Sequence, residues 1–566
     1  ADEHKSHLLL VPSGELQRTV ADDAQHTLPN FRQGDAIVLY ERNADTDNVT
    51  NKMVFKGNID YLNENEICIR LRATQQNSSV LPSDSLYAIE HDEMDTTFRS
   101  MYQGLYAFMS ATKERRDLLL FQREPQFDVA LDKQIAEAAD DFTRIALKAK
   151  AAKDYFLLVG PPGTGKTSCA LKKMVETFYK EEGAQILLLS YTNRAVDEIC
   201  KALSSIRPEV DFIRVGSELS CDENYRDHLI ENELATCMRR TEVCERINRC
   251  RILVGTVASI SGKPELFRLK HFDVAIVDEA TQILEPQLLG ILCAKGENGK
   301  EGVGKFILIG DHKQLPAVVL QNSEQSEVYD EALSAVGLKN LKDSLFERLY
   351  RTARQHTDAH RTYDMLCRQG RMHPEVALFA NQAFYEGRLL PVGLPHQLED
   401  SGNINRLSFY PSQPEPMGSS AKTNHSEAKI AARLAATVYK EHSEAFDASR
   451  TLGIITPYRS QIALVKKEIE ALGIPELNQI LIDTVERFQG SERDVIIYSF
   501  CVNYPYQLKF LSNLTEEDGI LIDRKLNVAL TRARKQMLLT GVPTLLERNP
   551  LYKSLLKLIE SLRNIA

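Results

Sequence analysis

Residues 155–167 read YFLLVGPPGTGKT, and this stretch decides the fold. An apolar run leads into a loop of the form G-x-x-x-x-G-K-[ST], and a helical pattern begins near Ser168. That strand–loop–helix context predicts a loop whose backbone N–H groups wrap phosphate groups at a helix N-terminus. We expect Lys166 to reach the β- and γ-phosphates of a nucleoside triphosphate and Thr167 to hold Mg²⁺.

Similar apolar runs recur along the chain in two sets. The first set continues with ILLLS (186–190), RILVGT (251–256), DVAIVD (273–278) and FILIGD (306–311); the second consists of TLGIITP (451–457), QILIDT (479–484), DVIIYSF (494–500) and QMLLTG (536–541). Short, almost wholly apolar strands that alternate with helices are typical of parallel sheets covered on both faces. The sequence therefore predicts an α/β protein with two such domains, at 126–350 and 351–566.

The region before these domains has a different pattern. Residues 31–92 contain short strands separated by turns, which predicts a small barrel. From Asp95 the apolar residues Phe98, Met101, Tyr102, Leu105 and Phe108 follow helical spacing. We expect a helical stalk over about 95–118 with these residues as its packing stripe, within an accessory region at 1–125.

Composition excludes several classes of protein. The 566 residues are 43% apolar and 26% charged, which excludes a disordered chain, a collagen and a disulfide-stapled miniprotein. No run of 18 apolar residues occurs, so we expect no membrane-spanning helix. The net charge of −10 excludes a globally basic surface but leaves room for a local basic channel.

Ten cysteines without a C-x-x-C pair favour buried, reduced thiols over a metal site. Reduced thiols indicate a cytoplasmic location, or a nuclear one in a eukaryote. The chain starts with neither methionine nor a signal-peptide core, so we expect a processed chain or a piece of a longer one.

Acidic and amide side chains follow two of the predicted strands. Asp278 and Glu279 end the run VAIVDEATQ, where Asp278 would bind the metal and Glu279 would polarise the attacking water. Gln314, in GDHKQLP, could hydrogen-bond the γ-phosphate and report its presence.

Eight motifs in sequence order resemble those of superfamily 1 helicases. They are GPPGTGKT, SYTNRAVDEI, VDEATQ, GDHKQLPA, GRMHPEV, TPYRSQ, TVERFQGSERDVI and LNVALTRAR. The most similar branch contains the nonsense-mediated-decay RNA helicase, senataxin and the helicase–nuclease of Okazaki-fragment processing. The resemblance covers about 130–545 strongly and implies two RecA-like domains with ATP between them.

The resemblance also assigns residue roles. It gives Arg371 and Arg532 to the γ-phosphate, in keeping with the bidentate fit of guanidinium to phosphate, and Glu492 to the ribose or to the arginine network. Gln134 stands where the family places an adenine-reading glutamine, although a surface glutamine is the alternative interpretation. The expected ATP-binding residues are Gln134, Gly160, Pro161, Pro162, Gly163, Thr164, Gly165, Lys166, Thr167 and Glu492. The expected catalytic residues are Lys166, Glu279, Gln314, Arg371 and Arg532.

Nucleic-acid contacts are expected where polar residues follow the apolar strands, because open α/β sheets bind ligands at that edge. The candidates are Thr192, Asn193, Thr256, Thr456, Arg459 and Thr484, and helix capping is the alternative for each. Thr and Asn can bind backbone phosphates without reading bases, which suits a motor that tracks any sequence.

The resemblance implies 5′→3′ movement along a single strand, on DNA more than RNA. An RNA or hybrid helicase and a non-unwinding ATP-dependent switch remain alternatives, and a nuclease domain or partner outside this chain stays open.

One motif departs from the family pattern. Where the family has Q-Y-R-M-H-P, this chain has Gln369-Gly370-Arg371-Met372-His373-Pro374, so the ring that stacks on the nucleobase is missing. Either another aromatic fills the space, or selectivity for ATP over GTP is weak. In the second case we expect Gly370→Tyr to lower the KM for ATP.

Overall fold

The computed structural model describes residues 7–10, 31, 34–62, 66–73, 80–92, 96–319, 321, 323–356, 361–399, 405–416, 418–517 and 519–563. The chain divides into two compact units, Ala1–Phe98 and Arg99–Ala566.

The first unit is a five-stranded antiparallel sheet in the order β1-β4-β3-β2-β5. Its strands are β1 (His7–Leu10), β2 (Ala36–Glu41), β3 (Val54–Leu62), β4 (Ile67–Leu71) and β5 (Tyr87–His91). Ile37, Leu39, Phe55, Ile59 and Ile69 form its core. The last four strands lie where the sequence predicts them. The described strands form an open sheet where the sequence predicts a barrel, because their pairing runs from β1 to β5 without returning to β1.

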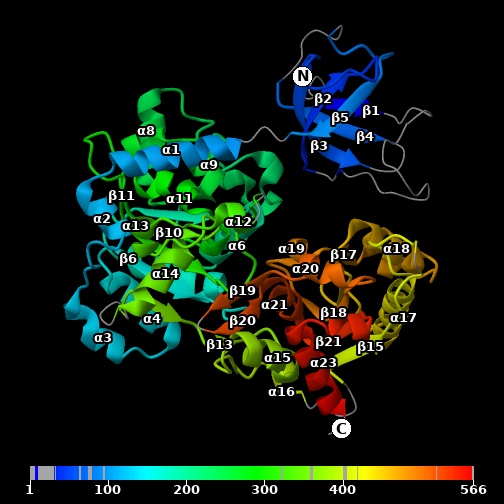
Figure 1. The fold of residues 1–566 in the computed structure, drawn as a ribbon. Helices are drawn as coiled ribbons and strands as arrows, with labels where there is room; N and C mark the ends of the chain where they lie inside the picture. The colour runs from blue at the N-terminus through cyan, green and yellow to red at the C-terminus, as the bar shows by residue number, and fades with distance from the viewer. Residues whose placement is uncertain are drawn as a thin grey trace. The chain divides into compact units, whose positions relative to one another are not determined.

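The second unit contains both α/β domains (Figure 1). The first is built on a seven-stranded parallel sheet in the order β12-β6-β11-β10-β7-β9-β8. Its strands are β6 (Tyr155–Val159), β7 (Ile186–Ser190), β8 (Phe212–Val215), β9 (Ile252–Thr256), β10 (Phe272–Val277), β11 (Val303–Gly310) and β12 (Tyr363–Met365). Because β12 pairs with β6, the first sheet takes in chain beyond the predicted boundary at 350.

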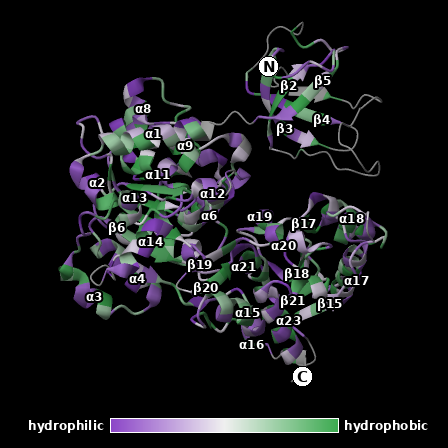
Figure 2. Cartoon of the chain, in the orientation of Figure 1, coloured by the Kyte–Doolittle hydropathy of each residue, from purple (hydrophilic) through white to green (hydrophobic). Residues whose placement is uncertain are grey.

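Both faces of this sheet are covered, as the unbroken apolar runs predict. Along β6, Tyr155, Leu157 and Val159 belong to one core, and Phe156 and Leu158 to the other. The concentration of hydrophobic residues on the central strands is visible in Figure 2. One core is closed by α4 (Asp141–Ala151), α5 (Lys172–Tyr179) and α6 (Asn193–Ser204); the other by α2 (Lys113–Leu119), α9 (Val257–Ser261), α10 (Glu265–Leu269), α11 (Glu285–Leu292) and α14 (Leu345–Gln355). Further helices of this domain are α3 (Asp132–Ala136), α7 (Ile230–Glu233), α8 (Arg240–Arg249), α12 (Ser323–Ser326) and α13 (Glu331–Ala335).

The predicted stalk forms two helices, α1 (Thr96–Ser110) and α2, and not one. Thr112 separates them, since its hydroxyl caps α2 by accepting from the N–H of Arg115. The predicted packing stripe is wrong for Phe98, Tyr102 and Leu105, which are exposed. Helix α1 instead approaches α11 closely at Gly104, where a Cβ would lie 1.8 Å from the carbonyl oxygen of Pro286.

The second α/β domain has a five-stranded parallel sheet in the order β15-β21-β18-β16-β17. Its strands are β15 (Leu407–Pro411), β16 (Leu452–Ile455), β17 (Leu481–Asp483), β18 (Arg493–Ser499) and β21 (Ala533–Gly541). Its helices are α15 (Pro374–Phe384), α16 (Pro395–Leu398), α17 (His425–Glu441), α18 (Arg459–Glu470), α19 (Val485–Phe488), α20 (Leu508–Leu511), α21 (Arg524–Leu530), α22 (Pro543–Leu546) and α23 (Pro550–Arg563). Two small pairs complete it: β13 (Arg368–Gln369) with β14 (Leu390–Pro391), and the hairpin of β19 (Leu514–Glu517) and β20 (Ile520–Asp523). Among the helices described for this chain, none has the length and apolar character needed to cross a membrane.

Candidate nucleotide site

The loop after β6 has backbone conformations that favour glycine. Gly163 and Gly165 have φ angles of +73° and +76°, which other residues rarely adopt. The space is also confined, since a Cβ on Gly163 would lie 2.4 Å from the Cβ of Arg371. Thr164 is buried and donates its hydroxyl to the carbonyl of Pro161 at 2.7 Å. This shape lets backbone N–H groups approach phosphate oxygens closely.

Lys166 and Thr167 each contact an acidic residue that follows β10. The Nζ of Lys166 lies 2.6 Å from Oε1 of Glu279, and the hydroxyl of Thr167 donates to Oδ2 of Asp278 at 2.5 Å. Burial raises the pKa of Asp278 to about 6, and the charge of Glu279 adds to that effect. Burial also acts to raise the pKa of Glu279, but the Lys166 ammonium outweighs it and the net pKa is lowered. A buried carboxylate such as Asp278 gains from a positive charge beside it.

Glu279 is held in an unusual backbone conformation. Its φ of +53° and ψ of +37° lie in the left-handed region, which costs energy for a residue with a side chain and is frequent at functional sites. Gln282 donates to Oε2 of Glu279 at 3.0 Å. The turn after β10 therefore fixes both the backbone and the carboxylate of Glu279.

Gln314 connects the two α/β domains. Its Nε2 donates to Oδ2 of Asp311 at 2.7 Å, and its Oε1 accepts from Nη2 of Arg532 at 3.2 Å. Arg532 comes from the second domain and is 2% exposed. Burial, with the nearby charge of Arg371, lowers the pKa of Arg532 to about 9. The predicted sensor and one predicted arginine thus meet directly.

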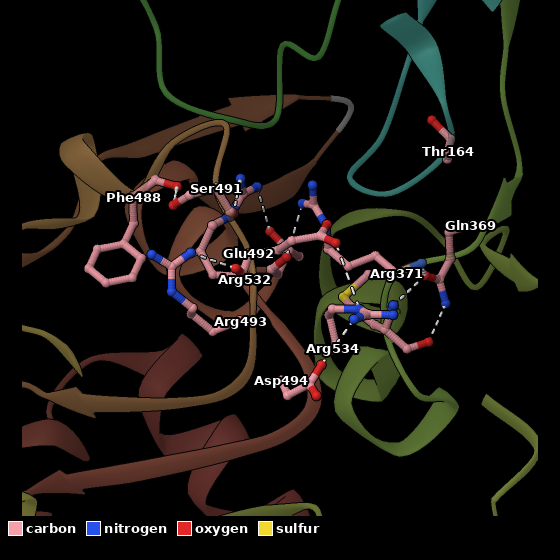
Figure 3. A network of polar contacts seen from close by, with 12 residues as sticks. Thr164, Gln369, Arg371, Phe488, Ser491, Glu492, Arg493, Asp494, Arg532 and Arg534 are labelled. Carbon is pink, nitrogen blue, oxygen red and sulfur yellow. Dashed lines mark hydrogen bonds and ion pairs between the residues drawn. The ribbon is translucent and has the colours of Figure 1, made fainter. Parts of the chain in front are cut away.

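Arg371 lies on a network of charged residues in the second domain (Figure 3). Its Nε donates to Oε2 of Glu492 at 2.6 Å, and Arg534 approaches Oε1 of the same carboxylate at 3.7 Å. Burial acts to raise the pKa of Glu492, but Arg371 and the other arginines outweigh it and lower the pKa. Because Arg371 also packs on Gly163, the network adjoins the phosphate loop.

Sequence reasoning missed two residues of this interface, Tyr385 and Asn527. The hydroxyl of Tyr385 donates to Oδ2 of Asp311 at 2.7 Å, and Nδ2 of Asn527 donates to the Tyr385 oxygen at 2.8 Å. All three side chains are buried. Asn527 lies inside the recognised motif LNVALTRAR, but the motif does not reveal its contact with Tyr385. No sequence pattern around Tyr385 indicates its contact with Asp311.

Gln134 lies on α3 and is exposed. Phe142, in the first turn of α4, is the side chain from this region that reaches the loop: its Cζ lies 3.5 Å from the position of a Cβ on Gly165. Gln134 as the adenine-reading residue stays a prediction.

Known protein families match both domains. One model, described as an AAA domain, matches residues 137–243 and 232–322, and a second, also described as an AAA domain, matches residues 341–544. The "DNA replication ATP-dependent helicase/nuclease DNA2" of Bos taurus is 27% identical over 590 residues, covering 94% of this chain and 50% of the relative. The chain belongs to the superfamily 1 ATP-dependent helicases.

Two further relatives are also described as helicases. The DNA2 protein of Homo sapiens is 28% identical over 535 residues, 85% of this chain and 46% of the relative. "DNA polymerase alpha-associated DNA helicase A" of Saccharomyces cerevisiae is 26% identical over 482 residues, 72% of this chain and 65% of the relative. The chain thus spans about half the length of the DNA2 proteins it matches. A solved arterivirus nonstructural protein 10 (helicase) with DNA aligns with a TM-score of 0.35 and 16% identity, covering 70% of this chain and 62% of that one.

The helicase has a groove of about 1260 Å³ with walls from both α/β domains. Thr192 lines it, together with Gln489 of the TVERFQG motif, and basic side chains in its walls outnumber acidic ones. The other expected nucleic-acid residues lie at strand ends or helix starts: Asn193 begins α6, Thr256 ends β9, Thr456 follows β16, Arg459 begins α18 and Thr484 precedes α19. Thr192 and Thr256 also cap helices by accepting from backbone N–H groups, so capping accounts for part of their pattern.

The ten cysteines of the helicase are free thiols. Six are buried, as predicted, but Cys169 is exposed. It follows the phosphate loop by two residues, and its Sγ lies 3.3 Å from the position of a Cβ on Gly165.

Proposed function

We propose that this chain is an ATP-driven motor that moves 5′ to 3′ along a single strand of DNA and unwinds duplexes. The observation that carries the proposal is the contact between Gln314 and Arg532 across the two α/β domains. It links the end of one nucleotide-binding sheet to an arginine of the other, so that binding and hydrolysis can change how the domains sit together. The direction of movement rests on the family resemblance alone.

ATP is proposed to lie with its phosphates on the loop 160–167. Thr167 and Asp278 would hold Mg²⁺, in keeping with a buried carboxylate whose pKa is raised to about 6 and with the preference of Mg²⁺ for one or two protein ligands beside phosphate oxygens. The ion would neutralise charge on the phosphates.

The protein side chains would carry the rest of the hydrolysis. Lys166 would exchange Glu279 for the phosphates, which leaves Glu279 free to orient and polarise the attacking water. Arg532 and Arg371 would stabilise the charge that develops on the γ-phosphate. In the structure Lys166 contacts Glu279, Arg532 contacts Gln314 and Arg371 contacts Glu492, each pair within 3.2 Å. These contacts would then be replaced by contacts to the nucleotide.

The groove lined by Thr192 and Gln489 is the proposed path of the single strand. DNA is preferred over RNA because the relatives above carry DNA in their names. Because thiols stay reduced only in a reducing compartment, the free cysteines fit the cytoplasm or, in a eukaryote, the nucleus.

Strand displacement tests this proposal and its two alternatives. The substrates are duplexes of DNA, RNA and hybrid, each with a 5′ or a 3′ single-stranded tail, with Glu279→Gln as the inactive control. The proposal requires ATP-dependent displacement of 5′-tailed DNA. Displacement of RNA or hybrid duplexes alone would favour the RNA helicase, and nucleic-acid-stimulated ATPase without displacement would favour the switch.

A further inference from the structure

The hairpin of β19 and β20 helps to line the groove between the two α/β domains. All four residues of β19, Leu514–Glu517, line it, and two of them, Glu516 and Glu517, carry carboxylates. Like charges repel, so a carboxylate is poorly suited to hold the phosphates of a strand. The place of Glu517 in this wall therefore needs another explanation.

Glu517 joins the hairpin to the first α/β domain. Its Oε2 lies 2.8 Å from Nε2 of His312, and its Oε1 accepts from Nη1 of Arg354 at 3.3 Å. Burial acts to raise the pKa of Glu517, but His312 and the nearby cationic side chains outweigh it and lower the pKa to about 2. The carboxylate is thus ionised at neutral pH and is held from two sides by the first domain.

His312 lies in the turn that positions Gln314. Its ring is buried and packs on the ring of Tyr350 in α14, with the ring centroids 4.9 Å apart. The preceding residue, Asp311, accepts from Nε2 of Gln314 at 2.7 Å and from the N–H of Lys313 at 3.1 Å. A shift of His312 would therefore move the group that holds Gln314.

The other end of the hairpin leads to Arg532. Asp523, the last residue of β20, caps α21 by accepting from two of its backbone N–H groups. This helix ends at Leu530, two residues before Arg532. Both partners of the contact between Gln314 and Arg532 are thus attached to the hairpin, one through His312 and the other through the chain itself.

We propose that the β19–β20 hairpin is the element through which a strand in the groove sets the rate of ATP hydrolysis, and that Glu517 is its positioning residue. The inference rests on the proposed function for the places of strand and nucleotide. A strand in the groove lies against the hairpin, and the contact of Glu517 with His312 transmits the position of the hairpin to Gln314. Because a misplacement of about 1 Å can change a catalytic rate strongly, a small shift is enough.

ATPase activity measured at saturating single-stranded DNA tests the inference. Glu517→Gln keeps the shape of the side chain and removes its charge. We expect kcat at saturating DNA to fall about tenfold, with the KM for ATP unchanged, because the first domain still holds the phosphates. Fluorescence anisotropy of labelled DNA should show an affinity no weaker than that of wild type, since the lost group is an anion. A loss of stimulation that follows from weaker DNA binding would overturn the inference.

Glu301→Gln is the matched control. The side chain of Glu301 is 25% exposed and lies 2.6 Å from Arg115, which is 6% exposed; the values for Glu517 and His312 are 26% and 8%. Arg115 lies on α2 and Glu301 precedes β11, so this pair belongs to the first domain alone. Glu301→Gln should be stimulated by DNA as strongly as wild type. Equal losses in the two variants would reduce the Glu517 effect to one of general stability and overturn the inference.

A double-mutant cycle tests the route through His312. Residues that act through each other have non-additive effects, so His312→Gln and the double variant should lose stimulation to the same extent as Glu517→Gln. Additive losses, or full stimulation of Glu517→Gln, would contradict the inference. A wild type that hydrolyses ATP but responds to no strand would instead refute the proposed function, and the inference with it.

Discussion

The two α/β domains hold the side chains proposed to act in catalysis in different ways. In the first, Lys166 and Thr167 are paired within the domain, with Glu279 and Asp278 at the end of β10, which lies two strands from β6 in the sheet. In the second, Arg532 finds its partner Gln314 in the other domain. Under the proposed function, nucleotide binding would be a property of the first domain, whereas hydrolysis would depend on the alignment of both. Substitutions on the two sides should therefore separate binding from turnover.

The largest effect is expected inside the first domain. Lys166→Ala should abolish ATP turnover, because the lysine is the expected phosphate contact of the loop. Glu279→Gln should retain ATP binding and reduce stimulated hydrolysis to less than about a tenth of wild type, since the amide cannot polarise water as the carboxylate does. Equilibrium binding of a fluorescent ATP analogue, measured beside steady-state ATPase, checks both. A Glu279→Gln enzyme with more than that activity would remove the glutamate from the reaction.

The second domain should show the converse pattern. Arg532→Ala should lower kcat by about 10³ or more while leaving ATP affinity nearly unchanged, because the first domain still holds the phosphates. Arg532→Lys should not restore the rate, since a lysine lacks the planar fork. The same two assays apply. If Arg532→Ala weakened binding as strongly as turnover, the separation between domains would fail.

Tyr385 sharpens the comparison because its hydroxyl joins the two domains at Asp311. Tyr385→Phe removes the hydrogen bonds to Asp311 and Asn527, and we expect kcat to fall about tenfold with KM for ATP unchanged, as Asp311 no longer holds Gln314 correctly. Tyr552→Phe is the matched control: Tyr552 is equally buried and donates to Asp523 at 2.8 Å, within the second domain. Both variants should lose about 1 kcal/mol of stability, but only the first should lose kcat. Equal kcat in the two would make Tyr385 purely structural.

The smallest effect on catalysis is expected at Glu427, a buried carboxyl of the second domain. Burial raises its pKa from 4.5 to about 7, against the hydrogen bonds from Cys501 and Ser499 that lower it. The folded state therefore binds the proton more tightly than the unfolded state, so its contribution to stability is full below pH 4.5 and is lost as the pH rises towards 7. In Glu427→Gln this dependence should disappear.

Urea unfolding at pH 5 and pH 8 measures the effect. The fall in the free energy of unfolding between the two pH values should be smaller in Glu427→Gln than in wild type, by at most about 3 kcal/mol, and kcat at pH 7 should be unchanged. An identical pH dependence in both proteins would show that Glu427 does not titrate in this range.

Gly370 shows where a motif comparison needs the structure. The expectation that Gly370→Tyr lowers the KM for ATP assumes open space at that position. Because Val392 and Leu394 occupy it, a tyrosine ring must displace the pair, and we now expect the substitution to raise KM. No motif indicated this pair. The side chain of Gln397 holds the segment in place by donating to the carbonyl of Gln369 and accepting from the N–H of Leu394, and Gln397 lies 27 residues beyond Gly370 in the chain.

The sequence by itself determined the features that depend on neighbouring residues. The phosphate loop, the central strands of both sheets and the acidic pair at 278–279 were all predictable, because an apolar run, glycines with positive φ and a helix start act within a few residues of one another. The family motifs extended this to Arg371 and Arg532, whose partners lie far away in the chain.

The tertiary structure alone decided which distant groups meet. Strand β12 joins the first sheet and β15 the second, although β12 lies beyond the predicted boundary and β15 lies in a stretch rich in loop residues, because pairing across a sheet satisfies their backbone groups. Tyr385 reaches Asp311, 74 residues away, and Phe142 reaches the phosphate loop, through packing that leaves no periodic signature. Three of the five residues of the α1 stripe are exposed for the same reason: helical spacing gives a helix its apolar face, but only the fold determines which side chains find a neighbour.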